Sequence, residues 1–165
     1  MDPARCLRHL LAWPWRLRRC FPPATLSAIE QAIQASELRH GGEIRFVLEH
    51  ALDPLLALKG LGGHERALQV FAQQRVWDTE ANCGVLVYLL FADRDIEIVA
   101  DRGINHRVAA ETWQQIAHTM EARYRQGDFL GGSLSAIEEI TELLACHFPR
   151  TATDVDELPN RPVLL

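Results

Sequence analysis

The stretch between Asn82 and Gly103 constrains the fold more than any other part of the sequence. It contains seven consecutive apolar residues, 85–91. An apolar run of this length, rich in Val and aromatic residues, is typical of a strand covered on both faces. A second β-favouring run, 95–100, follows after only three residues, so the two runs are predicted to form an antiparallel hairpin. Helices must therefore cover both faces of the sheet.

The residues before this hairpin predict a further strand and a helical connection. Residues 43–50 alternate apolar and polar side chains, which indicates a strand. Two helical segments follow at 53–59 and 64–76, and Asp53-Pro54 supplies a helix cap followed by Pro at the first helical position. Because a helical connection joins 43–50 to 85–91, these strands should be parallel, with a right-handed crossover.

Three more helices complete the expected fold. They cover 25–38, 108–125, and a segment that begins at the capping box of Ser135 and Glu138 and stops before Pro149. The predicted class is α/β, a small α/β/α sandwich with a mixed sheet and the element order α-β-α-β-β-α-α. We expect a basic N-terminal arm at 1–23, one domain at 24–149, and a polar C-terminal tail at 150–165.

The charge of the chain is unevenly distributed. The net charge is −5, which weighs against a nucleic-acid partner. Residues 1–20 carry five Arg and one Asp, or +4, which leaves −9 for the remainder. We predict that the arm contacts an anionic membrane surface or other envelope-associated proteins. The alternative is a loosely docked arm without a partner. The predicted contact residues are Arg5, Arg8, Trp13, Trp15, Arg16, Arg18 and Arg19.

Cysteine spacing and hydropathy indicate the cellular setting. The four Cys show neither CxxC spacing nor a neighbouring His at ligand spacing, which weighs against zinc. Free thiols favour a cytoplasmic protein, which the basic arm would place at the periphery of the inner membrane. No window approaches the ~20 apolar residues that a bilayer span requires.

Polar residues cluster where the hairpin begins and ends. Antiparallel pairing places these two positions side by side at one end of the sheet. Their oxygen atoms predict a site for Ca²⁺ or Mg²⁺, with Asp78, Glu80, Asn82, Asp101 and Asn105 as the ligands. Catalysis there would use an Arg to clamp a phosphate and a His for acid–base chemistry, with Asp78, Asp101, Arg102 and His106 as the candidates. The alternative is that these residues cap turns, form local ion pairs or are solvated.

The opposite end of the hairpin carries Asp93-Arg94-Asp95. Asp residues are common in tight turns because their side chains bond nearby backbone groups. A cation site in this turn is therefore a weaker candidate than the one at the other end of the sheet.

Several well-known site motifs are absent from the sequence. Gly60-Leu-Gly62-Gly63-His64 lacks the GK[ST] ending of a P-loop, and no GxGxxG follows the first strand. Neither a GxSxG nucleophile elbow nor an HExxH zinc motif is present. Each of these enzyme classes is correspondingly disfavoured.

A set of short motifs is spread over residues 25–148: Trp77, Asn82-x-Gly84-Val85-Leu86, Asp93-Arg94, Ile96-x-Ile98, Asp101-x-Gly103-Ile104, Gly127-Asp128-Phe129 and Gly132. Together they resemble the TPM domain family, which includes a plant thylakoid-lumen protein linked to photosystem II repair and bacterial envelope proteins. The resemblance implies a small α/β/α fold, divalent-cation binding through acidic side chains, and an acid-phosphatase-like activity. Other members look like accessory proteins at membranes.

The sequence departs from the pattern of that family at its acidic positions. Members often have Gly-Leu-Glu after the third strand and an Asp a few residues later, where this chain has Gly103-Ile104-Asn105 and Ala110. We also expect the chain to resemble the short branch that lacks a signal peptide and a C-terminal membrane helix. The favoured function is a non-catalytic accessory module at or near the inner membrane. The alternatives are a divalent-cation-binding domain and a weak metal-dependent phosphatase.

Overall fold

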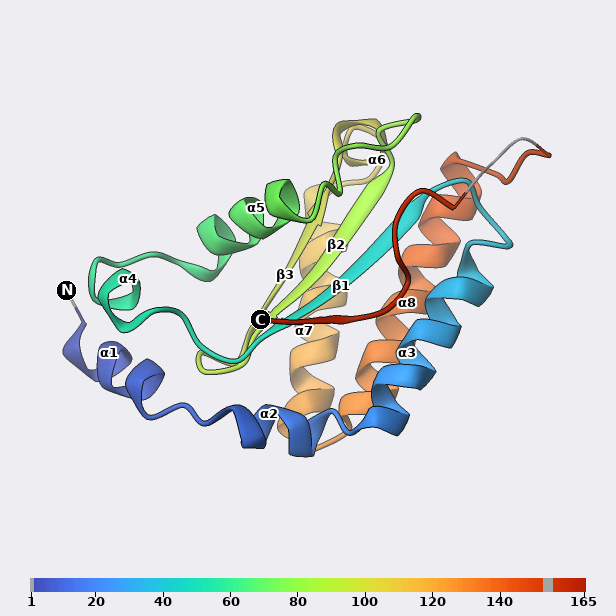
Figure 1. Cartoon of the computed structure of the whole chain (residues 1–165). Helices are drawn as coiled ribbons and strands as arrows, with labels where there is room; N and C mark the ends of the chain where they lie inside the picture. Colours follow the sequence, from blue (N-terminus) through green and yellow to red (C-terminus); the bar gives the residue numbers. More distant parts are fainter. Residues whose placement is uncertain (1, 153–155) are drawn as a thin grey trace.

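The computed structural model describes residues 2–152 and 156–165 and confirms the expected α/β sandwich with a mixed sheet (Figure 1). Residue 1 of the predicted arm and residues 153–155 of the predicted tail lie outside the described residues. The described strands follow the order β3-β2-β1-β4. β2 runs parallel to β1 and antiparallel to β3, as the sequence predicted. The strands are β1 (Glu43–Glu49), β2 (Gly84–Leu90), β3 (Asp95–Ala100) and β4 (Val163–Leu164).

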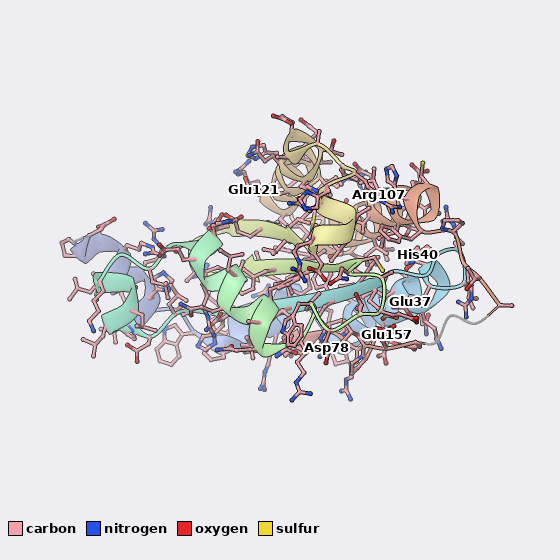
Figure 2. All side chains as sticks on the ribbon, turned by 90° about the horizontal axis from the view of Figure 1, so that it is seen from above. Glu37, His40, Asp78, Arg107, Glu121 and Glu157 are labelled. Carbon is pink, nitrogen blue, oxygen red and sulfur yellow. The ribbon has the colours of Figure 1, made fainter. Side chains whose placement is uncertain are left out.

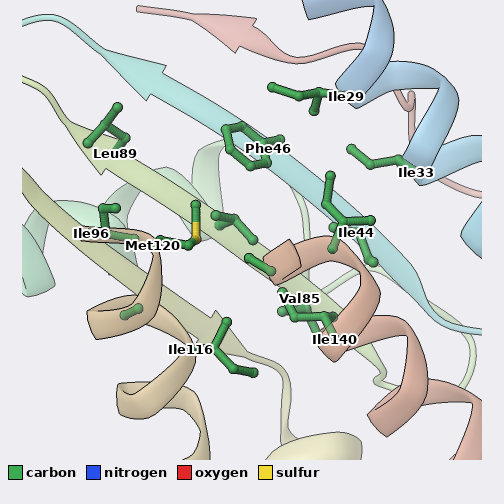
Figure 3. Packing of buried hydrophobic residues seen from close by; sticks show 14 of the residues in the cluster. Ile29, Ile33, Ile44, Phe46, Val85, Leu89, Ile96, Ile116, Met120 and Ile140 are labelled. Carbon is green, nitrogen blue, oxygen red and sulfur yellow. The ribbon is translucent and has the colours of Figure 1, made fainter. Parts of the chain in front are cut away.

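One face of the sheet carries the larger hydrophobic core. It is covered by α3 (Pro23–Ser36), α7 (Ala110–Arg125) and α8 (Phe129–His147). Alternate residues of the strands point toward these helices, because successive side chains of a strand face opposite sides. Figure 3 shows how Phe46, Val85 and Leu89 meet the side chains of the helices.

The other face is covered by α5 (Gly63–Gln73), and α4 (Pro54–Leu58) contributes Ala57 to the same cluster. Leu86 and Leu90 pack there, and the hydroxyl of Tyr88 donates to Glu49 Oε2 at 2.6 Å. Arg66 binds the same carboxylate through Nε at 2.8 Å and Nη2 at 3.1 Å. The polar groups of Tyr88 and Glu49, both buried in the sheet, are therefore hydrogen-bonded to each other and, through Arg66, to α5. The continuous apolar run of β2 follows from its burial on both faces.

The helix predicted to begin at Ser135 in fact begins at Phe129. Asp128 caps it, since its Oδ1 accepts from the backbone N–H of Gly131 at 2.9 Å. Gly132 therefore lies inside the first turns, where a Cβ would sit 2.8 Å from a ring carbon of Tyr124. Gly132 allows close packing of α8 on α7, and the Gly131 backbone lies against the capping carboxylate of Asp128, so the glycine pair does not form a turn between the helices.

Residues 150–165 were predicted to be a polar tail, but the described part of this segment packs on the sheet. Val163 and Leu164 pair in parallel with Val47 and Leu48. Arg45 Nη1 donates to the carbonyl oxygens of Pro159 and Arg161, the latter at 3.2 Å. The segment thus adds a fourth strand on the outer side of β1.

The N-terminal arm also lies on the domain and forms two helices, α1 (Pro3–Leu10) and α2 (Pro14–Cys20). Leu17 and Phe21 are buried in the larger core. The ring of Phe21 meets those of Tyr124 at 5.7 Å and Phe129 at 5.4 Å between centroids. α1 packs against α4 at the far end of the molecule (Figure 1).

Candidate functional site

The end of the sheet that was predicted to carry the chemistry has the expected arrangement of strands. The backbone N–H of Asp101 donates to Gly84 O at 2.8 Å, and that of Gly103 donates to Asn82 O at 2.8 Å. Arg102 Nη2 lies 3.4 Å from Asn82 Oδ1. The start of β2 and the short helix α6 (Arg102–Asn105) are therefore neighbours.

The individual side chains of that group do not gather around one point. Asp101 is buried and caps α6, and its Oδ1 accepts from the Arg102 N–H at 2.7 Å. Asp78, Glu80, Asn105 and His106 are exposed. Within the described residues, none of these acidic or His side chains belongs to a group of three whose ligand atoms converge. The predicted metal and catalytic roles of this set remain predictions.

A second acidic group lies at the same end of the sheet, closer to β1. Glu37 follows the last turn of α3, Glu43 begins β1, and Asp156 belongs to the C-terminal segment. One potential ligand atom of each lies within 4.8 Å of the others. Figure 2 shows Glu37 beside His40 and Glu157 at this end. The carboxylates that converge at this end of the sheet therefore lie beside β1 and not beside β3, where the sequence had predicted them.

Backbone groups of the C-terminal segment hold Glu43. The N–H of Glu157 donates to its Oε1 at 3.0 Å, and the N–H of Leu158 donates to its Oε2 at 3.3 Å. The carboxylate of Glu157 in turn accepts from the backbone N–H of Glu80 at 3.1 and 3.3 Å. The C-terminal segment therefore connects β1 to the loop that leads into β2.

Burial strongly affects the ionisation of this group. Burial, together with the negative charges of Glu43 and Asp156, raises the pKa of Glu37 above its ordinary value. Burial also raises the pKa of Glu43, against the opposing effect of its two backbone donors. His40, buried close by, has its pKa lowered by burial to about 4. The charged forms of all three side chains are disfavoured, as expected where water is excluded.

The turn at the opposite end of the sheet binds the N-terminal arm. Asp93 accepts from Arg5 Nη2 at 2.7 Å and Nε at 2.9 Å, and from Arg8 Nη1 at 3.1 Å. His9 Nε2 lies 3.1 Å from the same carboxylate. Burial alone would raise the pKa of Asp93, but hydrogen bonds from Arg5 and His9 and the charge of Arg5 outweigh it and lower the pKa. The carboxylate of Asp93 is therefore occupied by side chains of the N-terminal arm. This argues against the weaker cation site that was considered for the hairpin turn.

His9 is fixed on both ring nitrogens. Its Nδ1 accepts from the backbone N–H of Leu52 at 3.0 Å, so Nε2 carries the proton that faces Asp93. The His9 side chain is fully buried, and the Asp93 side chain is 11% exposed. α1 is consequently held in one orientation rather than lying loosely on the surface.

This orientation leaves an apolar surface uncovered. Leu10 is 64% exposed, and Trp13 and Trp15 are 61% and 56% exposed. Leu7 and Leu11 are exposed to a similar degree, and Arg16, Arg18 and Arg19 of α2 are also exposed. A hollow of about 700 Å³ lies between this part of the arm and the hairpin turn, with Leu89 and Phe129 in its wall. We call the exposed residues among these the arm surface: Leu7, Leu10, Leu11, Trp13, Trp15, Arg16, Arg18 and Arg19. Among the predicted contact residues, Arg5 and Arg8 bind Asp93, and the others lie on the arm surface.

Sequence reasoning did not identify Asp93 as the anchor of the arm, nor Glu37, Glu43 and Asp156 as a group. Each depends on contacts between residues far apart in the chain. One local signal was available: Asp2 precedes Pro3, and its side chain accepts from the backbone N–H of Ala4 at 3.0 Å. An Asp cap followed by Pro is a helix-start signal, and it predicts helical structure in the arm.

Comparisons with known proteins agree with the fold. The family model of the TPM domain matches residues 18–143. A solved structure, the NMR structure of BA42 protein from the psychrophilic bacterium Bizionia argentinensis, is similar with 31% sequence identity and a TM-score of 0.75. The similarity covers 86% of this chain and 93% of that one. No curated protein matches the sequence.

Proposed function

This chain belongs to the TPM domain family, and we propose that it is a non-catalytic accessory module that docks on an anionic membrane surface through its arm surface. The observation that carries this proposal is the exposure of five large apolar side chains beside exposed arginines. They lie on a segment that the domain holds rigidly. A bacterial inner membrane supplies the required negative surface.

The exposed apolar side chains of the arm surface indicate a binding surface into which apolar groups can insert. Single exposed apolar residues are ordinary, but a contiguous set marks an interaction surface. Here Leu7, Leu10 and Leu11 are each more than half exposed, and the two Trp residues follow within four positions. Leu55 of α4, the helix that packs on α1, is 66% exposed as well. Trp is favoured at the headgroup level because its ring is apolar and its N–H is polar.

The exposed arginines of the arm surface indicate that the membrane surface is anionic. Arg16, Arg18 and Arg19 are exposed, and no ion pair in the described part of the chain engages them. Each basic side chain near an anionic membrane contributes about 1 kcal/mol, so three contribute about 3 kcal/mol. The rest of the chain carries net negative charge. An anionic surface would therefore attract the arm and repel the body, which orients the molecule.

Within the described residues, no helix combines the length and apolar character needed to cross a bilayer. Contact through the arm surface would thus be peripheral. Asp78 and Asp101 belong to no converging group of carboxylates in the part of the chain that the structure describes, which gives the phosphatase alternative less support than the docking role.

Co-sedimentation with vesicles tests the proposal. We expect the full chain to bind vesicles that contain phosphatidylglycerol and to bind purely zwitterionic vesicles at least tenfold more weakly. Replacing Arg16, Arg18 and Arg19 by Gln removes about 3 kcal/mol, or roughly a hundredfold in partition constant. Point variants are preferable to removing residues 1–21, because that deletion also takes Leu17 and Phe21 out of the core.

Matched controls come from the opposite part of the molecule. The Trp13→Ser and Trp15→Ser double variant is compared with Leu68→Ser and Trp77→Ser, whose parent side chains are 47% and 50% exposed. We expect only the first pair to weaken vesicle binding. Equal binding by both double variants would contradict the proposal. Failure of the full chain to bind anionic vesicles would also contradict the proposal, and it would favour a protein partner for the same surface.

A further inference from the structure

The hollow between the N-terminal arm and the hairpin turn has the size of a ligand site. Its volume is about 700 Å³, within the range of about 300–1,000 Å³ that is typical of small-molecule sites. Its walls come from the arm, from the turn that joins β2 to β3, and from the neighbouring ends of α7 and α8 (Figure 1). The arm is fixed at both ends, because Asp93 binds Arg5 and Phe21 is buried in the core. The hollow is therefore part of the fold.

The deeper part of the hollow is apolar. Leu89 of β2 and Ile96 of β3, both labelled in Figure 3, belong to its wall and are buried among the core residues. The rings of Tyr124 and Phe129 add aromatic carbon, with their centroids 5.1 Å apart. The Tyr124 hydroxyl is already bonded to Ser133 Oγ at 2.6 Å, so it needs no polar partner in the hollow. Such a wall favours a hydrocarbon chain.

The charged side chains around the hollow are mainly basic. Its lining carries four Arg against one Asp and one Glu, or +2, although the whole chain is negative. Both carboxylates already have cationic partners. Asp93 accepts from Arg8 Nη1 at 3.1 Å, and Glu121 Oε2 accepts from Arg125 Nη2 at 2.7 Å. The acidic residues of the lining therefore do not oppose an anionic ligand.

Two arginines of the lining remain available to such a ligand. Arg16 belongs to α2, and Arg94 belongs to the hairpin turn. Both are exposed, and neither side chain forms an ion pair or a hydrogen bond within the described residues. A guanidinium binds a carboxylate through two parallel hydrogen bonds, which gives both strength and orientation. The hollow thus combines an apolar interior with free cationic groups.

We propose that this hollow binds one long-chain fatty acid as its carboxylate anion. The hydrocarbon chain lies against Leu89, Ile96 and Phe129, and Arg94 pairs with the carboxylate. The two chemical features of a fatty acid match the two features of the hollow, its apolar wall and its positive charge. Leu11, Trp13 and Arg16 belong both to this lining and to the arm surface. The site nevertheless goes beyond membrane docking, because a fatty acid dissolved in water would bind without a bilayer.

Calorimetric titration of the full chain with sodium tetradecanoate tests the proposal. The titration is done at pH 8, without vesicles and below the concentration at which the fatty acid forms micelles. We expect one tetradecanoate per chain. Decanoate, which is four methylenes shorter, should bind at least tenfold more weakly, because each fully buried methylene strengthens binding about fourfold.

A matched pair of variants tests the role of Arg94. Arg94→Gln should weaken tetradecanoate binding at least tenfold, because the carboxylate loses its charged partner. Arg75→Gln is the control, since Arg75 is also exposed and does not line the hollow. The two positions share a left-handed backbone, with φ of 57° at Arg94 and 55° at Arg75. Arg75→Gln should therefore bind as the unmodified chain does.

Alkylation of cysteine shows where the ligand binds. Cys20 lines the hollow and is partly exposed, whereas Cys146 is exposed on α8 outside it. Saturating tetradecanoate should slow the reaction of Cys20 with a maleimide at least fivefold and leave that of Cys146 within twofold.

Three results would overturn the proposal: no binding of tetradecanoate, equal affinity in Arg94→Gln and Arg75→Gln, or binding that leaves Cys20 unprotected. If the chain still binds anionic vesicles in any of these cases, membrane docking stands and only the fatty-acid site is refuted.

Discussion

Replacing Asp93 by Asn should release α1 from the domain. Asp93 is the shared acceptor for Arg5, Arg8 and His9, and its side chain is 11% exposed. The substitution keeps the size of the side chain but removes its charge. The new side-chain amide would also turn an N–H₂ group toward donors that now face a carboxylate. The variant therefore probes the ion cluster with little effect on packing.

The expected magnitude follows from the exposure of each partner. Arg8 is 53% exposed, and exposed pairs contribute ~0–1 kcal/mol. Arg5, the more buried of the two charged partners, is 17% exposed, and the fully buried His9 donates to Asp93 as a neutral ring. Removing one partner of a fully buried pair costs ~3–5 kcal/mol, because the remaining charge is left without compensation. For this partly buried cluster we expect a loss of about 3 kcal/mol in the docking free energy of α1.

Hydrogen exchange of the α1 amides measures this loss directly. A change of about 3 kcal/mol corresponds to an increase of roughly 150-fold in the exchange rate of α1. Amides of α7 should be little affected, because local release of α1 leaves the main core in place. Asp78→Asn serves as the control, since it removes an exposed carboxylate. If α1 in Asp93→Asn exchanges within twofold of the unmodified chain, the cluster does not hold the arm and the reasoning is refuted.

Three further outcomes can be measured by chemical unfolding. Gly84→Ala should destabilise the fold by about 2 kcal/mol or more, because a Cβ would lie 2.0 Å from the carbonyl oxygen of Val76; Gly62→Ala, where a Cβ meets nothing within 4 Å, is the control. In EDTA, stability should fall as pH rises above the ordinary pKa of Glu, since the folded state retains protons that the unfolded state has lost. The slope is at most ~1.4 kcal/mol per pH unit for each proton. Glu37→Gln should flatten that slope, and an unchanged slope would refute the assignment. In acid, protonation of buried His40 should favour unfolding as pH falls from its ordinary pKa toward about 4, and His40→Gln should lose this dependence.

The sheet could be predicted because its signals are local. The apolar run that became β2 is continuous, and the three-residue gap before β3 allows only a hairpin. The parallel pairing of β1 and β2 followed from the helical connection between them. These inferences need no knowledge of distant residues, and each is confirmed.

The features that the sequence did not predict depend on distant contacts or very short elements. β4 has two residues and stands between Pro162 and the last residue, so it has no periodic pattern to read. Asp93 binds arginine side chains that lie more than 80 positions earlier in the sequence, and Glu43 accepts hydrogen bonds from the segment that begins at Asp156. The sheet end was identified by topology, but its carboxylates converge beside β1 because the C-terminal segment supplies the third one.

The most direct test of membrane docking is the fluorescence of Trp13 and Trp15 in the presence of lipid. A variant with Trp77→Phe and Trp113→Phe retains only these two indoles. On anionic vesicles in EDTA, we expect a blue shift of the emission and quenching by phospholipids brominated near the headgroup end of the acyl chain. Acrylamide should quench the bound form less than the free form. Emission and acrylamide quenching that stay the same with and without anionic vesicles would contradict the account.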